Sequence, residues 1–169
     1  RFESRGLGDV YKRQPLDPVA VELVDDTMIN LAQKIDIFKP TVDAVVKGNP
    51  KSLLLVEFAE ENMDENHRRL KKLHQLIGDL GYSWNKGIRI GGVVDVIDSN
   101  LQSKVSEMRK SGLNIMMSMK NDAKPVSFIE DCAVELKNLA EYTDGLNKIF
   151  DKYNVKGTWY AHASVGCLH

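Results

Sequence analysis

The sequence predicts an α+β fold, a ferredoxin-like sandwich in which a mainly antiparallel sheet carries helices packed on one face. Three observations support this. Apolar runs of strand length alternate along the chain with amphipathic stretches of helix length. The 169 residues, 43% of them hydrophobic, suit one compact domain. Finally, no apolar run approaches the roughly 18 residues that a membrane-spanning helix needs.

The first third of the chain predicts a helix, a connector and a strand. Asp17 and Pro18 form an N-cap and first-turn pair. Apolar residues then recur at steps of three and four: Ala20, Val24, Met28, Leu31 and Ile35. Residues 39–50 contain two prolines and a glycine, so they are a connector with room for a helical turn around residues 42–46. Residues 53–59, an apolar run, predict a buried strand.

The middle of the chain repeats the pattern of helix and strand. An apolar stripe formed by Met63, Leu70, Leu73, Ile77 and Leu80 predicts a helix that ends at Gly81. Residues 84–92 are polar and rich in glycine, which indicates a loop, and residues 93–97 predict a second strand. Asp98 or Ser99 caps a third helix that ends near residue 112.

The last third predicts a methionine-rich connection, a strand, a helix and a final strand. Residues 126–134 alternate in the manner of a strand. An apolar stripe over residues 136–150 predicts the fourth helix. Residues 158–162 predict the last strand.

Charge and cysteine content exclude several classes of protein. Lys and Arg number 23 and Asp and Glu number 24, a net charge of −1, whereas a nucleic-acid-binding surface needs a basic excess. Nucleic acid is therefore not an expected partner. Cys132 and Cys167 follow neither a C-x-x-C spacing nor a secreted disulfide framework, which favours a reducing compartment.

Both ends of the chain indicate a piece of a longer protein. Residues 1–14, RFESRGLGDVYKRQ, carry four basic and two acidic side chains without apolar periodicity. They resemble a translated sequencing adapter and are expected to be foreign to the fold. The last seven residues are unusually apolar for a natural terminus. We therefore expect residues 15–169 to be an internal segment.

His162 and His169 are the candidate metal ligands. On a straight strand, residues seven apart point to opposite faces and lie roughly 23 Å apart. The two side chains can meet only if the chain bends, and Gly166 can adopt the backbone angles of such a bend. Spacing alone leaves a second interpretation open, in which both are ordinary histidines at strand ends. Cys167 is expected to pack, not to act as a nucleophile with His169.

The stretch GTWYAHASVGCLH, residues 157–169, resembles the signature of the C-terminal domain of FAD-linked oxidases, the family of D-lactate dehydrogenase, glycolate oxidase and D-2-hydroxyglutarate dehydrogenase. Residues 53–58, 108–113 and 125–131 support this resemblance, which covers nearly everything after residue 14. The variant looks like the branch that is fused to an iron–sulfur domain. It departs from the family pattern at Ala161, Val165 and Cys167, where the family has glycine, aspartate and asparagine.

The resemblance implies a function and its residues. His162 and His169 would bind a divalent metal, zinc or manganese, and Arg109 would bind the substrate carboxylate. The intact protein would oxidise a D-2-hydroxy acid, of the D-lactate or D-2-hydroxyglutarate type, by hydride transfer to FAD. The FAD-binding domain, and an iron–sulfur domain that accepts electrons, would lie elsewhere in the full-length chain, so this segment alone would be inactive. Such a protein would be cytoplasmic, free or peripheral at the inner membrane.

The residues also permit a function of a different class. In this alternative the chain is a non-catalytic, ferredoxin-like interaction or regulatory domain whose histidines are structural. Its sheet edge or a helical face would then pair with a partner chain.

Overall fold

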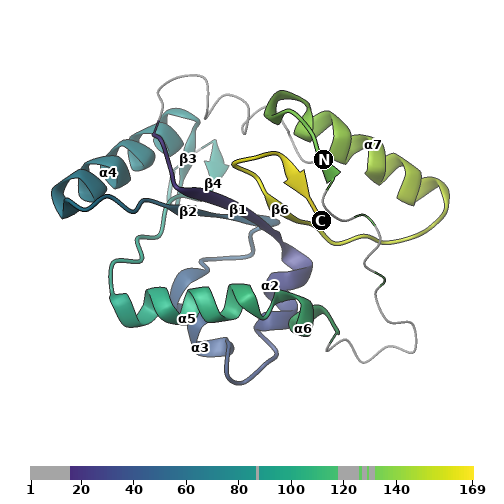
Figure 1. Cartoon of the computed structure of the whole chain (residues 1–169), viewed down its shortest axis with the longest axis horizontal. Helices are drawn as coiled ribbons and strands as arrows, with labels where there is room; N and C mark the ends of the chain where they lie inside the picture. The colour runs from purple at the N-terminus through teal and green to yellow at the C-terminus, as the bar shows by residue number, and fades with distance from the viewer. Residues whose placement is uncertain (1–15, 87, 118–125, 127–128, 130–131) are drawn as a thin grey trace. The chain divides into compact units, whose positions relative to one another are not determined.

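The computed structural model describes residues 16–86, 88–117, 126, 129 and 132–169, and it has the predicted α+β fold. Within these residues six α-helices accompany a five-stranded sheet and a two-stranded sheet (Figure 1). The helices are α2 (Asp26–Ala32), α3 (Lys39–Val45), α4 (Met63–Asp79), α5 (Ser99–Lys110), α6 (Gly112–Met117) and α7 (Leu139–Lys152), and the 3-10 turn η1 (Leu136–Asn138) precedes α7. The strands are β1 (Ala20–Asp25), β2 (Ser52–Glu57), β3 (Tyr82–Ser83), β4 (Arg89–Ile90), β5 (Cys132–Ala133), β6 (Tyr160–His162) and β7 (Cys167–Leu168).

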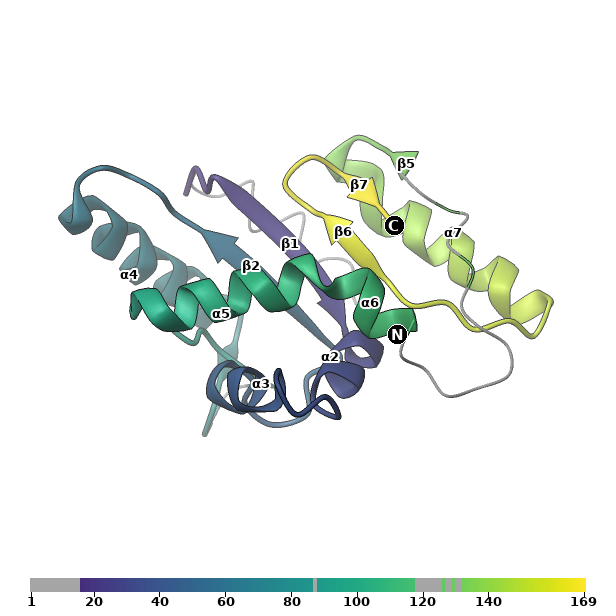
Figure 2. The ribbon, with the colours of Figure 1, turned by 60° about the horizontal axis from the view of Figure 1, so that its bottom comes forward.

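The five-stranded sheet has the order β2-β1-β6-β7-β5 (Figure 2). The Val19 amide donates to the Glu57 carbonyl at one end of the β1–β2 pair, and the Asp26 amide donates to the Lys51 carbonyl at the other. As the residue numbers rise along β1, those of the hydrogen-bonded residues on β2 fall, so these two strands are antiparallel. β7 is also antiparallel to both β6 and β5. The order brings β1 beside β6, although most of the chain separates them.

The chain forms two compact units, each with its own apolar core. The first comprises the described residues up to 23, then 54–93, and those from 129 onward. In its core, α7 packs through Leu139 against Trp159, Ala161 and Leu168. The Phe150 ring stacks on Trp159 with centroids 5.5 Å apart. Helix α7 therefore covers the sheet face to which Ala161 and Leu168 point.

The second unit comprises residues 24–53 and the described part of 94–128. Its core gathers apolar side chains from α2, α3 and α6: Met28, Ile29, Ala32, Val42 and Ile115. Helix α5 joins this core through Met108. The Asp98 carboxylate caps α5 by accepting from the Leu101 amide at 2.8 Å, so of the two caps that the sequence allowed, Asp98 and Ser99, it is Asp98.

The helix predicted from Asp17 to Ile35 is wrong in its first half. Residues 20–25 form β1, and the helix begins only at Asp26. Its N-cap is Asp25, whose carboxylate accepts from the Met28 amide at 3.1 Å. Asp17 instead has a positive φ of 48° and caps no helix. Pairing with β2 and β6 overrides the helical spacing of these apolar residues.

Several further expectations change or are met only in part. Residues 93–97 form no strand, residues 112–117 form α6 where a connection was expected, and the loop at 84–92 contributes β4 to a short parallel pair with β3. Of the strand predicted over 126–134, the described part contains only β5, while residues 127, 128, 130 and 131 lie outside the described residues. The helices predicted at 63–80, 99–112 and 136–150 and the strand at 53–59 appear as α4, α5, α7 and β2.

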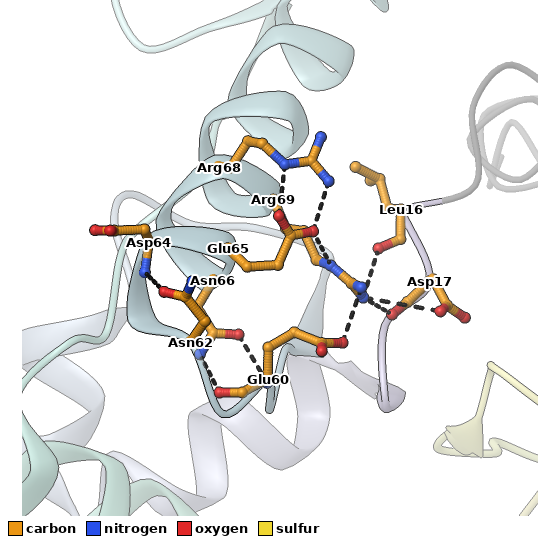
Figure 3. Close-up of polar contacts among 9 residues, drawn as sticks. All are labelled: Leu16, Asp17, Glu60, Asn62, Asp64, Glu65, Asn66, Arg68 and Arg69. Carbon is orange, nitrogen blue, oxygen red and sulfur yellow. Dashed lines mark hydrogen bonds and ion pairs between the residues drawn. The ribbon is translucent and has the colours of Figure 1, made fainter.

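Arg69 on α4 ties the N-terminal segment to this helix (Figure 3). Its guanidinium donates to the backbone carbonyls of Leu16, at 3.3 Å, and Asp17, at 2.6 Å. It also pairs with Glu60 at 2.8 Å and with Glu65 at 3.0 Å. The Arg69 side chain is only 14% exposed, whereas those of Glu60 and Glu65 are 39% and 29% exposed. We call Arg69 and these four partners the Arg69 cluster.

Among the helices of the described residues, none is long and apolar enough to span a membrane.

Candidate metal and substrate site

The candidate site lies on a β-hairpin. β6 and β7 are antiparallel, with Ala161 opposite Leu168 and His162 opposite Cys167. The pairing continues to Tyr160 and His169, whose backbones exchange hydrogen bonds of 3.1 and 2.7 Å. Side chains of directly opposed residues share a face. Tyr160, His162, Cys167 and His169 therefore lie on one face of the sheet, and buried Ala161 and Leu168 lie on the other.

The two histidines meet as the sequence analysis required. Their ring centroids are 5.0 Å apart and their planes are nearly perpendicular, at 89°. The bend that brings them together occupies residues 163–166. The hairpin thus replaces the straight strand that would have placed the side chains on opposite faces.

Gly166 makes this bend possible for two reasons. Its φ is +69°, a conformation that L side chains rarely adopt. Its backbone also lies close to the segment that follows β5, because a Cβ at this position would overlap the carbonyl oxygen of Val134. The Val134 amide donates to the Gly166 carbonyl at 2.9 Å. Glycine is therefore required both by the backbone angle and by the close approach.

Glu22 belongs to the same site, and the sequence analysis missed it. Its Oε2 atom lies 2.7 Å from Nδ1 of His162 and accepts a 2.7 Å hydrogen bond from the Tyr160 hydroxyl. The Glu22 side chain is 5% exposed and that of His162 is 39% exposed. A buried carboxylate needs such donors, since an unpaired one would lose much solvation free energy. The available signal was a single acidic residue within the apolar run from Val19 to Val24.

The two cysteines lie on opposite faces of the sheet. Cys167 Sγ is 3.7 Å from Nε2 of His169, on the face of the histidines. Cys132 is opposite Leu168, so it lies on the face that α7 covers. A hydrogen bond with the Cys132 thiol is the main cause that raises the pKa of Tyr142 on α7. Cys132 and Cys167 are both thiols and are not joined in a disulfide.

Arg109, the expected carboxylate ligand, lies in the last turn of α5. Its side chain is exposed, and the residue belongs to the second unit. Its role in substrate binding stays a prediction.

The donor set suits a divalent metal in part. Imidazole nitrogens are good ligands for zinc, and the hairpin places two imidazoles together. Among the described residues, however, no group of three or more His, Cys, Asp or Glu side chains is arranged to hold a metal ion. His162 and His169 thus fit as two ligands of a metal site and not as a complete one.

Comparison with known proteins places these observations in a family. A family described as "FAD linked oxidases, C-terminal domain" matches residues 9–169. Curated relatives include D-2-hydroxyglutarate dehydrogenases from Haemophilus influenzae, 31% identical over 157 residues, and from Escherichia coli, 28% identical over 155 residues. A third, from Pantoea ananatis, is 27% identical over 155 residues. Each match covers 89% of this chain but only 15% of the relative.

Proposed function

The chain belongs to the family of FAD-linked oxidase C-terminal domains, and on this premise we propose that it is part of a flavin-dependent dehydrogenase that oxidises a D-2-hydroxy acid. The family match over residues 9–169 is the observation that carries the proposal. The paired imidazoles on one sheet face support it independently, because they offer ligands for a metal that could bind a hydroxy acid. The names of the relatives favour D-2-hydroxyglutarate over D-lactate as the type of substrate.

Other parts of the intact protein are assigned by proposal as well. FAD, when bound, supplies the acceptor for the hydride that leaves the substrate α-carbon. Because the chain spans about 15% of the length of its curated relatives, we assign FAD binding, and electron transfer to an iron–sulfur domain, to other parts of such a protein.

The residues of this chain would bind and orient the substrate. His162 and His169 would hold a divalent metal, zinc or manganese, through neutral ring nitrogens. Arg109 would bind the substrate carboxylate, because a guanidinium matches a carboxylate with two parallel hydrogen bonds. Fixing the carboxylate and the hydroxyl together would orient the α-carbon, which is a large part of catalysis by positioning.

The test is flavin reduction by substrate. The flavin-loaded protein that contains this chain is mixed without oxygen with D-2-hydroxyglutarate, D-lactate or their L-enantiomers. We expect the D-acids to bleach the flavin absorbance and the L-acids not to, with D-2-hydroxyglutarate faster than D-lactate. A purified protein that holds no flavin, or whose flavin no D-2-hydroxy acid reduces, would instead support the non-catalytic interaction domain.

A further inference from the structure

We propose that Glu22 is a positioning residue that holds His162 in the Nδ1–H tautomer, so that Nε2 is the ring nitrogen offered to the divalent metal. This inference rests on the proposed function for the metal role of His162. It gives a task to a buried acidic residue that lies 140 positions from the histidine in the chain.

The tautomer follows from the hydrogen bond. Oε2 of Glu22 is 2.7 Å from Nδ1 of His162, a hydrogen-bond distance. An ionised carboxylate has no proton to donate, so Nδ1 must carry the hydrogen. A neutral imidazole carries only one N–H, which leaves the lone pair on Nε2. Nε2 is then the atom that can bind a metal without first losing a proton.

Tyr160 holds the carboxylate in place. Its hydroxyl donates to the same oxygen, Oε2, also at 2.7 Å. Glu22 is on β1 while Tyr160 and His162 are on β6, so the two hydrogen bonds join neighbouring strands of the sheet. Side chains held by such a network on rigid strands keep their orientation better than side chains on loops.

The two hydrogen-bonded side chains, Glu22 and His162, differ in their exposure to solvent. The Glu22 side chain is 5% exposed, so its hydrogen bonds are shielded from water, whereas the His162 side chain is 39% exposed. The His169 ring lies next to it, with centroids 5.0 Å apart. Histidine ligands commonly donate their second ring nitrogen to a carboxylate, which fixes the ring and makes it a stronger base. Glu22 and His162 have this arrangement.

The experiment measures tautomer and metal binding residue by residue. The 169-residue chain is labelled with ¹⁵N, and the ring nitrogens of His162 and His169 are observed by NMR while the pH is raised until their shifts no longer change, so that the tautomer is read on neutral rings. Zn²⁺ is then added and its affinity is read from the shifts of these two rings. The variants are Glu22→Leu, which removes the acceptor, and Glu22→Gln, which keeps the size and one acceptor oxygen. Glu57→Gln, an exposed glutamate on the neighbouring strand β2, is the matched control.

We expect the Nδ1–H form of His162 in the wild type and in Glu57→Gln. In Glu22→Leu we expect a return to the Nε2–H form that dominates in water, with zinc affinity lower by about 10- to 100-fold, and a smaller loss in Glu22→Gln. A wild-type His162 with its proton on Nε2, no zinc-dependent shift of its ring, or zinc affinity in a folded Glu22 variant equal to the wild type would each overturn the proposal.

The experiment still decides the question if one variant does not fold, and it distinguishes the role of Glu22 from the proposed reaction. If Glu22→Leu does not fold, the wild-type tautomer and Glu22→Gln decide the question by the same criteria. If the tautomer and zinc results hold while no D-2-hydroxy acid reduces the flavin of the intact protein, the proposed reaction is wrong and the role of Glu22 stands.

Discussion

The guanidinium of Arg69 donates a 2.6 Å hydrogen bond to the backbone carbonyl of Asp17, a residue 52 positions earlier in the chain. The same side chain reaches Glu60 and Glu65 on its other side (Figure 3). Arg69 therefore fastens the segment before β1 to the first turns of α4. The Arg69 cluster is a structural element, since every partner of this guanidinium within it belongs to the fold of the first unit.

Replacing Arg69 by alanine should lower the free energy of unfolding by about 2 kcal/mol, because hydrogen bonds to charged groups are lost and two carbonyls lose a donor. Arg68→Ala is the matched control, since Arg68 is 53% exposed and pairs with Glu65 on the helix surface. That variant should lose clearly less stability than Arg69→Ala, because an exposed pair is screened by solvent. Urea unfolding of both variants tests the prediction, and equal midpoints would contradict it.

Glu65 should make the stability depend on pH in the acid range. Hydrogen bonds from Arg68 and Arg69 lower the pKa of its carboxyl from 4.5 to about 2. A lowered pKa in the folded state means that the stabilisation is fully present above the usual value and is lost as pH falls toward the folded value. The unfolding temperature of the wild type should therefore fall between about pH 4.5 and 2, and this slope should be shallower in Glu65→Gln. Glu61→Gln, which removes an exposed carboxylate outside the Arg69 cluster, should keep the wild-type slope.

Gly166→Ala should disrupt the hairpin. The positive φ alone costs on the order of 1–3 kcal/mol for a residue with a side chain, and the overlap of the new Cβ with the Val134 carbonyl adds to this. Gly145→Ala on α7 is the control, because a Cβ there meets nothing within 4 Å. It should raise the stability by up to about 1 kcal/mol. Thermal unfolding compares them, and a Gly166→Ala protein as stable as the wild type would refute this account of the bend.

Arg109→Lys should weaken the oxidation of D-2-hydroxy acids in the intact protein. Lysine keeps the charge but loses the planar pair of donors, so KM should rise and kcat should fall, with kcat/KM lower by about tenfold or more. Lys110→Arg, the opposite exchange one residue later, should leave both constants unchanged. Kinetics of Arg109→Lys equal to those of the wild type at all substrate concentrations would remove Arg109 from the site.

Local signals predicted those elements that local contacts determine. Helix α4 was predicted because its apolar stripe and Gly81, which has a positive φ just after its end, lie within one short segment of the sequence. β1 was missed because its apolar residues also fit a helical spacing, and only pairing with distant strands decides between the two. Residues 93–97 were wrongly predicted as a strand. Their composition suits a strand, but they pair with no other strand in the described part of the chain.

In the candidate site too, the sequence predicted the contacts between residues that are close in the chain and missed the distant one. His162, His169 and the bend at Gly166 lie within eight residues, so spacing and backbone stereochemistry could relate them. Glu22 joins them only through the strand order, which places β1 beside β6. No periodicity or motif in the sequence expresses a contact across 140 residues.

The place of β1 between β2 and β6 has a consequence for biosynthesis. Synthesis proceeds from the N-terminus, so β1 and β2 can pair early, but the other edge of β1 stays open until residues 160–162 leave the ribosome. During that interval the strand presents unpaired backbone groups to other nascent chains, and the hydrogen bonds of Glu22 with Tyr160 and His162 are not yet formed. Pairing over such sequence distances is also slow. Nascent chains that stall before residue 160 should therefore aggregate or remain bound to chaperones, and release of the β6–β7 hairpin should end that dependence.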